Sequence, residues 1–191
     1  MTMMNGRKVG FVGEASVGKT SLILRMLGGE FDPNRARTLS PEFFEYKEEH
    51  GDDCSGILLV DTPGSDEYRS ISHNFLISCD IIVFVYDVTN DNSFNCIDSW
   101  LANVEEHCSG FVPIIVGTKI DLDGRKVAAE QGLQKAGNTD NFVECSSKTE
   151  NGSVQRLVER IIQIFEARDQ ELTADNPIGL PPLFDYQLDE T

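Results

Sequence analysis

The sequence predicts one α/β domain with a six-stranded, mostly parallel sheet flanked by helices. Short apolar segments of strand-like composition alternate with amphipathic segments along most of the chain, and this alternation is typical of parallel sheets covered on both faces. A glycine-containing segment, residues 13–20, joins the first strand to the first helix. The chain has 191 residues, of which 40% are apolar, and this is enough for one full-sized hydrophobic core.

The predicted elements follow from these patterns in chain order. A strand over 7–12 leads through the glycine segment into a helix over 19–28, whose apolar residues recur at helical spacing. The last helix, predicted over 151–168, carries an apolar stripe that would pack on the sheet: Val154, Leu157, Val158, Ile161, Ile162 and Phe165. The other strands are predicted near 42–48, 55–61, 81–86, 112–117 and 141–145, and the other helices near 68–79, 92–107 and 125–136.

Residues 13–20, Gly-Glu-Ala-Ser-Val-Gly-Lys-Thr, have the spacing of a phosphate-binding loop. The two glycines allow backbone angles that other residues resist, so the loop can direct its N–H groups at a phosphate beside a helix N-terminus. Lys19 would neutralise the β- and γ-phosphates, and the Thr20 hydroxyl would bind Mg²⁺. The alternative is a glycine-rich turn with a solvated lysine, but such a turn does not require the flanking strand and helix. The predicted nucleotide-binding residues of this loop are Gly13, Glu14, Ala15, Ser16, Val17, Gly18, Lys19, Thr20 and Ser21.

A second apolar segment, residues 57–61, ends in Asp-Thr-Pro-Gly. An acidic residue such as Asp61, at the end of a strand beside a phosphate-binding loop, can hold Mg²⁺. Gly64 can offer an unobstructed N–H to a terminal phosphate. The alternative is an ordinary turn, because Asp-x-x-Gly is frequent in turns.

Two later segments favour guanine over adenine. The apolar segment 112–117 runs into Thr-Lys-Ile-Asp, in which Asp121 can accept hydrogen bonds from the ring N1–H and the exocyclic amine of guanine. Adenine lacks that pair of donors, although taken alone Asp121 could equally cap a helix. The strand near 141–145 runs into Ser-Ser-Lys, where a backbone N–H can meet the guanine carbonyl oxygen. The predicted base-binding residues are Thr118, Lys119, Asp121, Ser146, Ser147 and Lys148.

The order and spacing of these motifs resemble the Ras superfamily of small GTPases over residues 8–167. The segment 82–94, followed by Trp100 and Leu101, is similar to the Rab branch in particular. The resemblance implies a P-loop NTPase fold of the G-domain type over residues 1–168, with an antiparallel hairpin of the second and third strands at the sheet edge. It also implies that GTP or GDP binds together with Mg²⁺.

The resemblance further implies two switch segments, residues 31–43 and 62–71, which contact effector, exchange-factor and GTPase-activating proteins. Thr38 lies nineteen residues beyond Lys19, where small GTPases place a threonine that binds Mg²⁺ and senses the γ-phosphate. Phe31 matches an aromatic residue that packs edge-on against guanine, although a lone phenylalanine is more often a core residue. The implied metal ligands are Thr20, Thr38 and Asp61, and the implied catalytic residues are Lys19, Thr38, Gly64 and Ser65.

The chain departs from this family at positions that matter for catalysis. Ser65 replaces the glutamine that orients the attacking water, and a serine side chain is too short to span the water and the γ-phosphate. Pro63 stiffens the start of the second switch, while Asp66 and Glu67 add negative charge near the γ-phosphate. Thr118 replaces the usual asparagine and has a shorter reach toward the phosphate-binding loop. We therefore expect nucleotide binding to be retained and hydrolysis to be slow, unless a partner supplies the missing group.

Two functions from different classes fit these residues. The first is a slow GTP/GDP switch, similar to the Rab proteins that direct vesicle traffic. The second is a scaffold that holds one nucleotide permanently and signals through its surface. A P-loop kinase is disfavoured, because such an enzyme needs an arginine-rich lid, and the arginines of this chain are few and form no cluster past the helices.

Composition and the C-terminal segment bound the partners and the compartment. The 16 Lys and Arg against 32 Asp and Glu give a net charge of −16, which disfavours binding to nucleic acid or an anionic membrane through a basic surface. The five cysteines include no C-x-x-C pair, as is typical of reduced thiols in the cytoplasm. Residues 169–191 are expected to form an acidic, proline-containing tail or linker, and no direct lipid anchor is expected because no cysteine follows Cys145. We expect a cytoplasmic protein, one recruited to endomembranes by partners, or a fragment of a longer chain.

Overall fold

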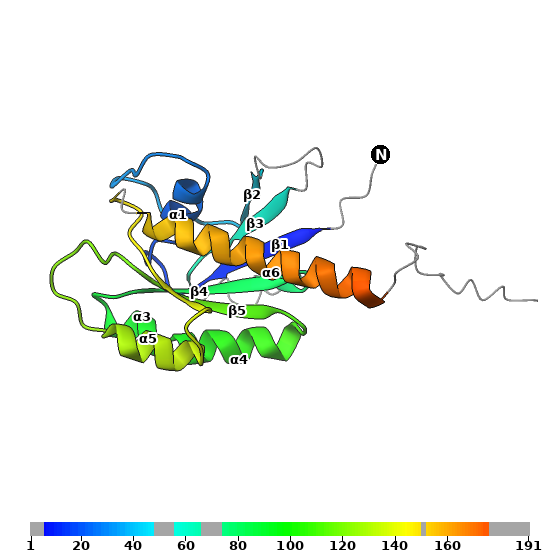
Figure 1. Cartoon of the computed structure of the whole chain (residues 1–191). Helices are drawn as coiled ribbons and strands as arrows, with labels where there is room; N and C mark the ends of the chain where they lie inside the picture. The colour runs from blue at the N-terminus through cyan, green and yellow to red at the C-terminus, as the bar shows by residue number, and fades with distance from the viewer. Residues whose placement is uncertain (1–5, 48–55, 66–73, 150–151, 176–191) are drawn as a thin grey trace, which may run out of the picture.

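The computed structural model describes residues 6–47, 56–65, 74–149 and 152–175. They form an α/β domain around a six-stranded sheet with the strand order β2-β3-β1-β4-β5-β6 (Figure 1). β2 pairs antiparallel with β3 at one edge, and the other neighbouring strands are parallel. The predicted fold class and the edge hairpin are thereby confirmed. The strands are β1 Arg7–Val12, β2 Glu42–Tyr46, β3 Ile57–Asp61, β4 Ile81–Asp87, β5 Val112–Thr118 and β6 Phe142–Glu144.

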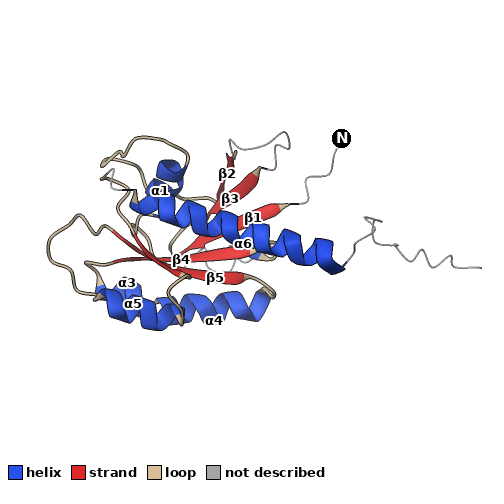
Figure 2. Ribbon diagram, in the orientation of Figure 1, coloured by secondary structure: helices blue, strands red, loops and turns tan. Residues whose placement is uncertain are grey.

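Helices cover both faces of the sheet (Figure 2). α1 and α6 pack on one face, and α3, α4 and α5 pack on the other. No helix in the described part of the chain is both long enough and apolar enough to cross a membrane. The helices are α1 Lys19–Met26, α3 Asp91–Asn95, α4 Ile97–His107, α5 Ala129–Ala136 and α6 Ser153–Asp175.

The structure corrects two of the predicted helices. The helix predicted over 92–107 is divided into α3 and α4 at Cys96, whose backbone caps the first helix and begins the second. The helix predicted over 125–136 begins only at Ala129. Its expected first turn is held elsewhere, because the N–H groups of Lys126 and Val127 both donate to the carbonyl oxygen of Val88 at the end of β4.

The last helix is longer than predicted, and two other predicted segments lie partly outside the described residues. α6 continues past residue 168 to Asp175, and Pro177 is the first proline to follow it. Arg7 in β1 forms an ion pair with Asp169, which ties this extension of α6 to the sheet. Of the helix predicted over 68–79, residues 74–76 are helical and 66–73 lie outside the described residues. The rest of the expected tail, 176–191, also lies outside them.

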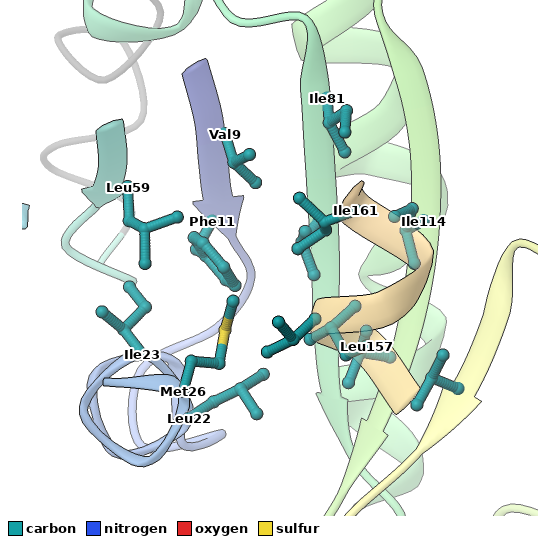
Figure 3. Packing of buried hydrophobic residues seen from close by; sticks show 14 of the residues in the cluster. Val9, Phe11, Leu22, Ile23, Met26, Leu59, Ile81, Ile114, Leu157 and Ile161 are labelled. Carbon is teal, nitrogen blue, oxygen red and sulfur yellow. The ribbon is translucent and has the colours of Figure 1, made fainter. Parts of the chain in front are cut away.

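Two buried clusters, one on each face of the sheet, fix this arrangement. Figure 3 shows the first cluster, in which β1 residues Val9 and Phe11 lie among side chains of α1 and α6. The apolar residues predicted to form a stripe on α6 belong to this cluster, and Leu157 and Ile161 among them are fully buried. The second cluster is built around Trp100 of α4 and the β4 side chains. Because both faces are covered, the loops at the carboxyl ends of the parallel strands are left to form the site.

Candidate nucleotide-binding site

A cavity of about 500 Å³ opens between the loops that follow β1, β3, β5 and β6. This size lies within the range of ordinary small-molecule sites. Fourteen residues predicted to bind the nucleotide line it together, although they come from segments far apart in the sequence. They are Ala15, Ser16, Gly18, Lys19, Thr20, Ser21, Phe31, Thr38, Gly64, Thr118, Lys119, Asp121, Ser147 and Lys148.

The phosphate-binding loop follows β1 and wraps around the Lys19 side chain. Gly13, Ser16 and Gly18 have φ angles of 141°, 64° and 104°, and such values favour glycine. The Lys19 ammonium donates hydrogen bonds to the carbonyl oxygens of Gly13 and Glu14, at 2.7 and 2.9 Å. Lys19 is only 6% exposed, and this burial lowers the pKa of its amine to about 8. The loop therefore holds a nearly desolvated cation where a phosphate would be bound.

Three oxygen-bearing side chains predicted to bind Mg²⁺ meet beside Lys19. The Thr20 Oγ1 atom lies 2.7 Å from Thr38 Oγ1, and these hydroxyls lie 2.5 and 3.3 Å from Asp61 Oδ2. Asp61 is fully buried, and burial raises the pKa of its carboxyl. Its other oxygen, Oδ1, has no hydrogen-bond partner among the described residues. An all-oxygen set with a buried, unsatisfied carboxylate oxygen suits a hard cation such as Mg²⁺, which would neutralise charge on the phosphates.

The second switch begins against the phosphate-binding loop. A side chain at Gly64 would place its Cβ atom 2.5 Å from both the backbone nitrogen of Ala15 and the carbonyl carbon of Glu14. Only glycine permits so close an approach. Thr62 anchors the segment from behind, because its hydroxyl donates to the Phe11 carbonyl oxygen at 2.7 Å. Ser65 is half-buried and is not among the residues that line the cavity. Asp66 and Glu67 lie outside the described residues.

The loops that follow β5 and β6 contribute the cavity residues predicted to recognise guanine. The Asp121 carboxylate accepts a hydrogen bond from Ser146 Oγ at 2.5 Å, which fixes its orientation. Ser146 Oγ also accepts from the backbone N–H groups of Lys148 and Thr149. The loop that follows β6 is therefore folded around the side chain that supports Asp121.

Thr118 and Lys119 join this end of the site to the phosphate-binding loop. The Thr118 hydroxyl lies 2.5 Å from the carbonyl oxygen of Val17 and 2.9 Å from that of Tyr86, so the shorter threonine does reach the loop. Lys119 has a φ of 62°, and its ammonium donates to the Ser16 carbonyl oxygen at 2.8 Å. The side chains of Thr118 and Lys119 therefore both bond to the backbone of the phosphate-binding loop.

Six predicted residues do not line the cavity, and five of them, all but Ser65, hold residues that do. The backbone carbonyls of Gly13 and Glu14 hold Lys19, and Val17 accepts from Thr118. Ser146 and Asp61 stand behind cavity residues. The Glu14 side chain is bound by α4, since the Trp100 indole N–H donates to its carboxylate at 3.0 Å. The six are Gly13, Glu14, Val17, Asp61, Ser65 and Ser146.

Sequence reasoning missed several residues of the site. Asp87, at the carboxyl end of β4, forms a 2.7 Å ion pair with Lys119. Burial opposes ionisation of Asp87, but hydrogen bonds from Lys119 and Thr89 lower its pKa overall. The sequence could have indicated Asp87 by its place at the end of a predicted strand. Its register partner in β5, Thr118, is known only from the structure. The cavity residues that were not predicted to bind the nucleotide are Asp32, Pro33, Arg35, Ala36, Arg37, Thr62 and Leu122. Most of them lie between Phe31 and Thr38, so their position in the sequence was a usable signal.

Comparison with known proteins identifies the family to which these features belong. A model of the Ras family matches residues 8–166. The chain belongs to the Ras family of small GTPases. Its relatives include Ras-related protein Rab-18-B of Danio rerio, which is 33% identical over 162 residues, 82% of this chain and 79% of the relative. Rab-18 of Lymnaea stagnalis is 32% identical over 178 residues, 88% of each chain. Human Rab-30 is 30% identical over 179 residues, 91% of this chain and 88% of the relative. The resemblance to the Rab branch is therefore confirmed.

Ras-family proteins are GTPases that bind GTP or GDP with Mg²⁺. The cavity of this member is lined by the acidic residue Asp121 and by a buried lysine whose neighbours carry three oxygen ligands. These groups suit a ligand that combines a base with a metal-bound phosphate chain.

Proposed function

We propose that this Rab-like protein is a GTP/GDP switch that hydrolyses GTP slowly and acts in membrane trafficking. The observation that carries the proposal is that one cavity is lined by Asp121 and Lys119 as well as by Lys19, Thr20 and Thr38. In this proposal Asp121 reads guanine, Lys19 binds the β- and γ-phosphates, and Thr20, Thr38 and Asp61 hold Mg²⁺. Phe31, 38% exposed at the mouth of the cavity, packs against the edge of the base.

Slow hydrolysis is the finer part of the proposal, and it rests on Ser65. A serine cannot contact the attacking water and the γ-phosphate together, whereas the family's glutamine orients that water. Losing such a contact raises the barrier by about 1.4 to 4 kcal/mol, or roughly ten- to a thousand-fold in rate. Nucleotide affinity is unaffected, because the residues proposed to bind the base, phosphates and metal are all present.

Partners are proposed to recognise the two switch segments, 31–43 and 62–71, and to recruit the protein to endomembranes. The first segment exposes two apolar side chains, Leu39 at 69% and Phe43 at 50%. Leu39 follows the loop that lines the cavity, and Phe43 lies in β2, so exposed apolar residues here can transmit the nucleotide state to a partner. The competing function is a scaffold that keeps one nucleotide and does not turn over.

The first experiment is to identify the nucleotide that the purified protein carries. We expect chromatography after denaturation to release GTP or GDP in near-stoichiometric amount. We also expect excess ATP to leave a bound fluorescent GDP in place. Release of an adenine nucleotide, or equal displacement by ATP and GTP, would refute guanine recognition by this site.

The second experiment replaces Ser65 with glutamine. The intrinsic single-turnover rate of GTP hydrolysis is expected to rise by about tenfold or more, equivalent to about 1.4 kcal/mol of barrier. The affinity for GDP should not change, because residue 65 would contact water and not the nucleotide. Ser109→Gln, in an exposed loop at the other end of the sheet, is the matched control. A flat rate would place the obstacle in the backbone around Pro63 or in the negative charge of Asp66 and Glu67. A fast wild-type rate would show that another group orients the water.

A further inference from the structure

Two arginines of the first switch segment line the nucleotide cavity, and they differ in their partners. The Arg35 guanidinium lies 3.8 Å from the Glu42 carboxylate. Within the described part of the chain, no hydrogen bond or ion pair involves the guanidinium of Arg37. Arg37 therefore retains its hydrogen-bond donors for a ligand of the cavity.

The position of Arg37 brings its charge to the phosphate end of the cavity. It directly precedes Thr38, whose hydroxyl lies 2.7 Å from that of Thr20 in the proposed metal site. Lys19 lines the same cavity, so the cavity offers two cationic side chains to an anionic ligand, and a bound phosphate chain would offset the repulsion between them.

We propose that Arg37 is a catalytic residue that binds the γ-phosphate in the transition state of GTP hydrolysis. This inference rests on the proposed function of the same site. In the reaction, a water oxygen forms a bond to the γ-phosphorus as the bond from that phosphorus to the bridging oxygen breaks. The electron pair of the broken bond stays on GDP, and one water proton passes to the released phosphate. The guanidinium stabilises the negative charge on the γ-phosphate and bridging oxygens during this step.

This role gives the chain, within its own first switch, the cation that GTPase-activating partners supply to many GTPases. Arg37 does not replace the missing glutamine, because a guanidinium cannot accept a proton or a hydrogen bond from water. Hydrolysis is therefore slowed by Ser65 but partly sustained by Arg37. An arginine fits this task better than a lysine, since its planar group can donate to two phosphate oxygens at once.

The test compares Arg37→Ala, Arg37→Lys and Arg35→Ala with a charge-matched control, Arg156→Ala, on the exposed face of α6. The full chain is loaded with GTP, and Mg²⁺ starts a single turnover while phosphate release is followed. Affinity for GDP and for GTP is measured in parallel. A further readout is whether GDP, Mg²⁺ and aluminium fluoride, which mimics the transferring phosphoryl group, form a complex detectable by ¹⁹F NMR.

We expect Arg37→Ala to lower the hydrolysis rate by at least about tenfold and to abolish the aluminium fluoride complex. We expect Arg37→Lys to recover little of the rate. In both variants the nucleotide affinities should stay close to those of Arg156→Ala. The inference is overturned if Arg37→Ala hydrolyses GTP like the control, if Arg35→Ala alone lowers the rate, or if Arg37→Ala loses nucleotide affinity in proportion to its rate. In each of these cases guanine binding by the wild type would still support the proposed function. A wild type that binds no guanine nucleotide would overturn both.

Discussion

Replacing Asp121 with asparagine is expected to weaken GDP and GTP binding by about a hundredfold or more, because two charge-assisted hydrogen bonds to guanine contribute about 3 kcal/mol or more. The asparagine amide would also point a donor at the donors of the base. Ser146 holds the Asp121 carboxylate at 2.5 Å, so the side chain cannot easily turn away to relieve this. Equilibrium titration with a fluorescent GDP measures the change.

Two controls make the Asp121 prediction specific to base recognition. Asp123→Asn removes the same charge from an exposed residue of the same loop and should leave affinity unchanged. Xanthosine diphosphate has a carbonyl group where guanine has its exocyclic amine, so it should bind Asp121→Asn better than GDP does. Unchanged GDP affinity in Asp121→Asn would mean that the carboxylate serves only to cap its own loop.

Replacing Lys19 with alanine is expected to reduce the affinity for both nucleotides by about a hundred- to a thousandfold, since removing one partner of a buried charge pair costs about 3–5 kcal/mol. Lys19 is 6% exposed, and within the described residues its ammonium donates hydrogen bonds to neutral carbonyl oxygens alone. A bound phosphate would therefore give the Lys19 ammonium a negatively charged hydrogen-bond partner. The control is Lys47→Ala, whose side chain is 74% exposed beyond the end of β2. An affinity loss no larger than that of the control would contradict a phosphate-binding role.

The pH dependence of binding provides a second test of Lys19. In the nucleotide-free protein, burial lowers the pKa of the Lys19 amine to about 8. The negative charges of Asp61 and Glu14 raise this pKa in part, and the positive charge of Arg37 lowers it further. Phosphate favours the charged amine and so raises its pKa. Nucleotide binding must then take up a proton at pH values above 8, and affinity should fall as the pH rises beyond that value. Calorimetry between pH 7 and 9 should show proton uptake in the wild type and none from this position in Lys19→Ala.

Local patterns in the sequence were sufficient for the fold class and for most of the loops that line the cavity, whereas the edge hairpin and the roles of Phe31 and Thr38 came from the resemblance to small GTPases. Gly13, Gly18 and Lys19 act within one loop whose backbone angles their residue types dictate. The spacing of apolar residues in α6 and in the strands likewise predicts which of their side chains are buried. Helix boundaries were predicted wrongly at Cys96, where local hydrogen bonds end one helix and begin the next, and before Ala129, where Lys126 and Val127 donate to the distant carbonyl oxygen of Val88.

The tertiary structure decided which distant side chains share an environment. Trp100 bonds to the side chain of Glu14 across 86 residues of sequence, and Asp87 pairs with Lys119 only because β4 and β5 are neighbours in register. No periodicity or spacing encodes these contacts, since they depend on how strands are ordered in the sheet. The same holds for Arg37, which in the sequence is one basic residue of a polar loop. Packing of that loop over the cavity is what places Arg37 among the residues that line the nucleotide site.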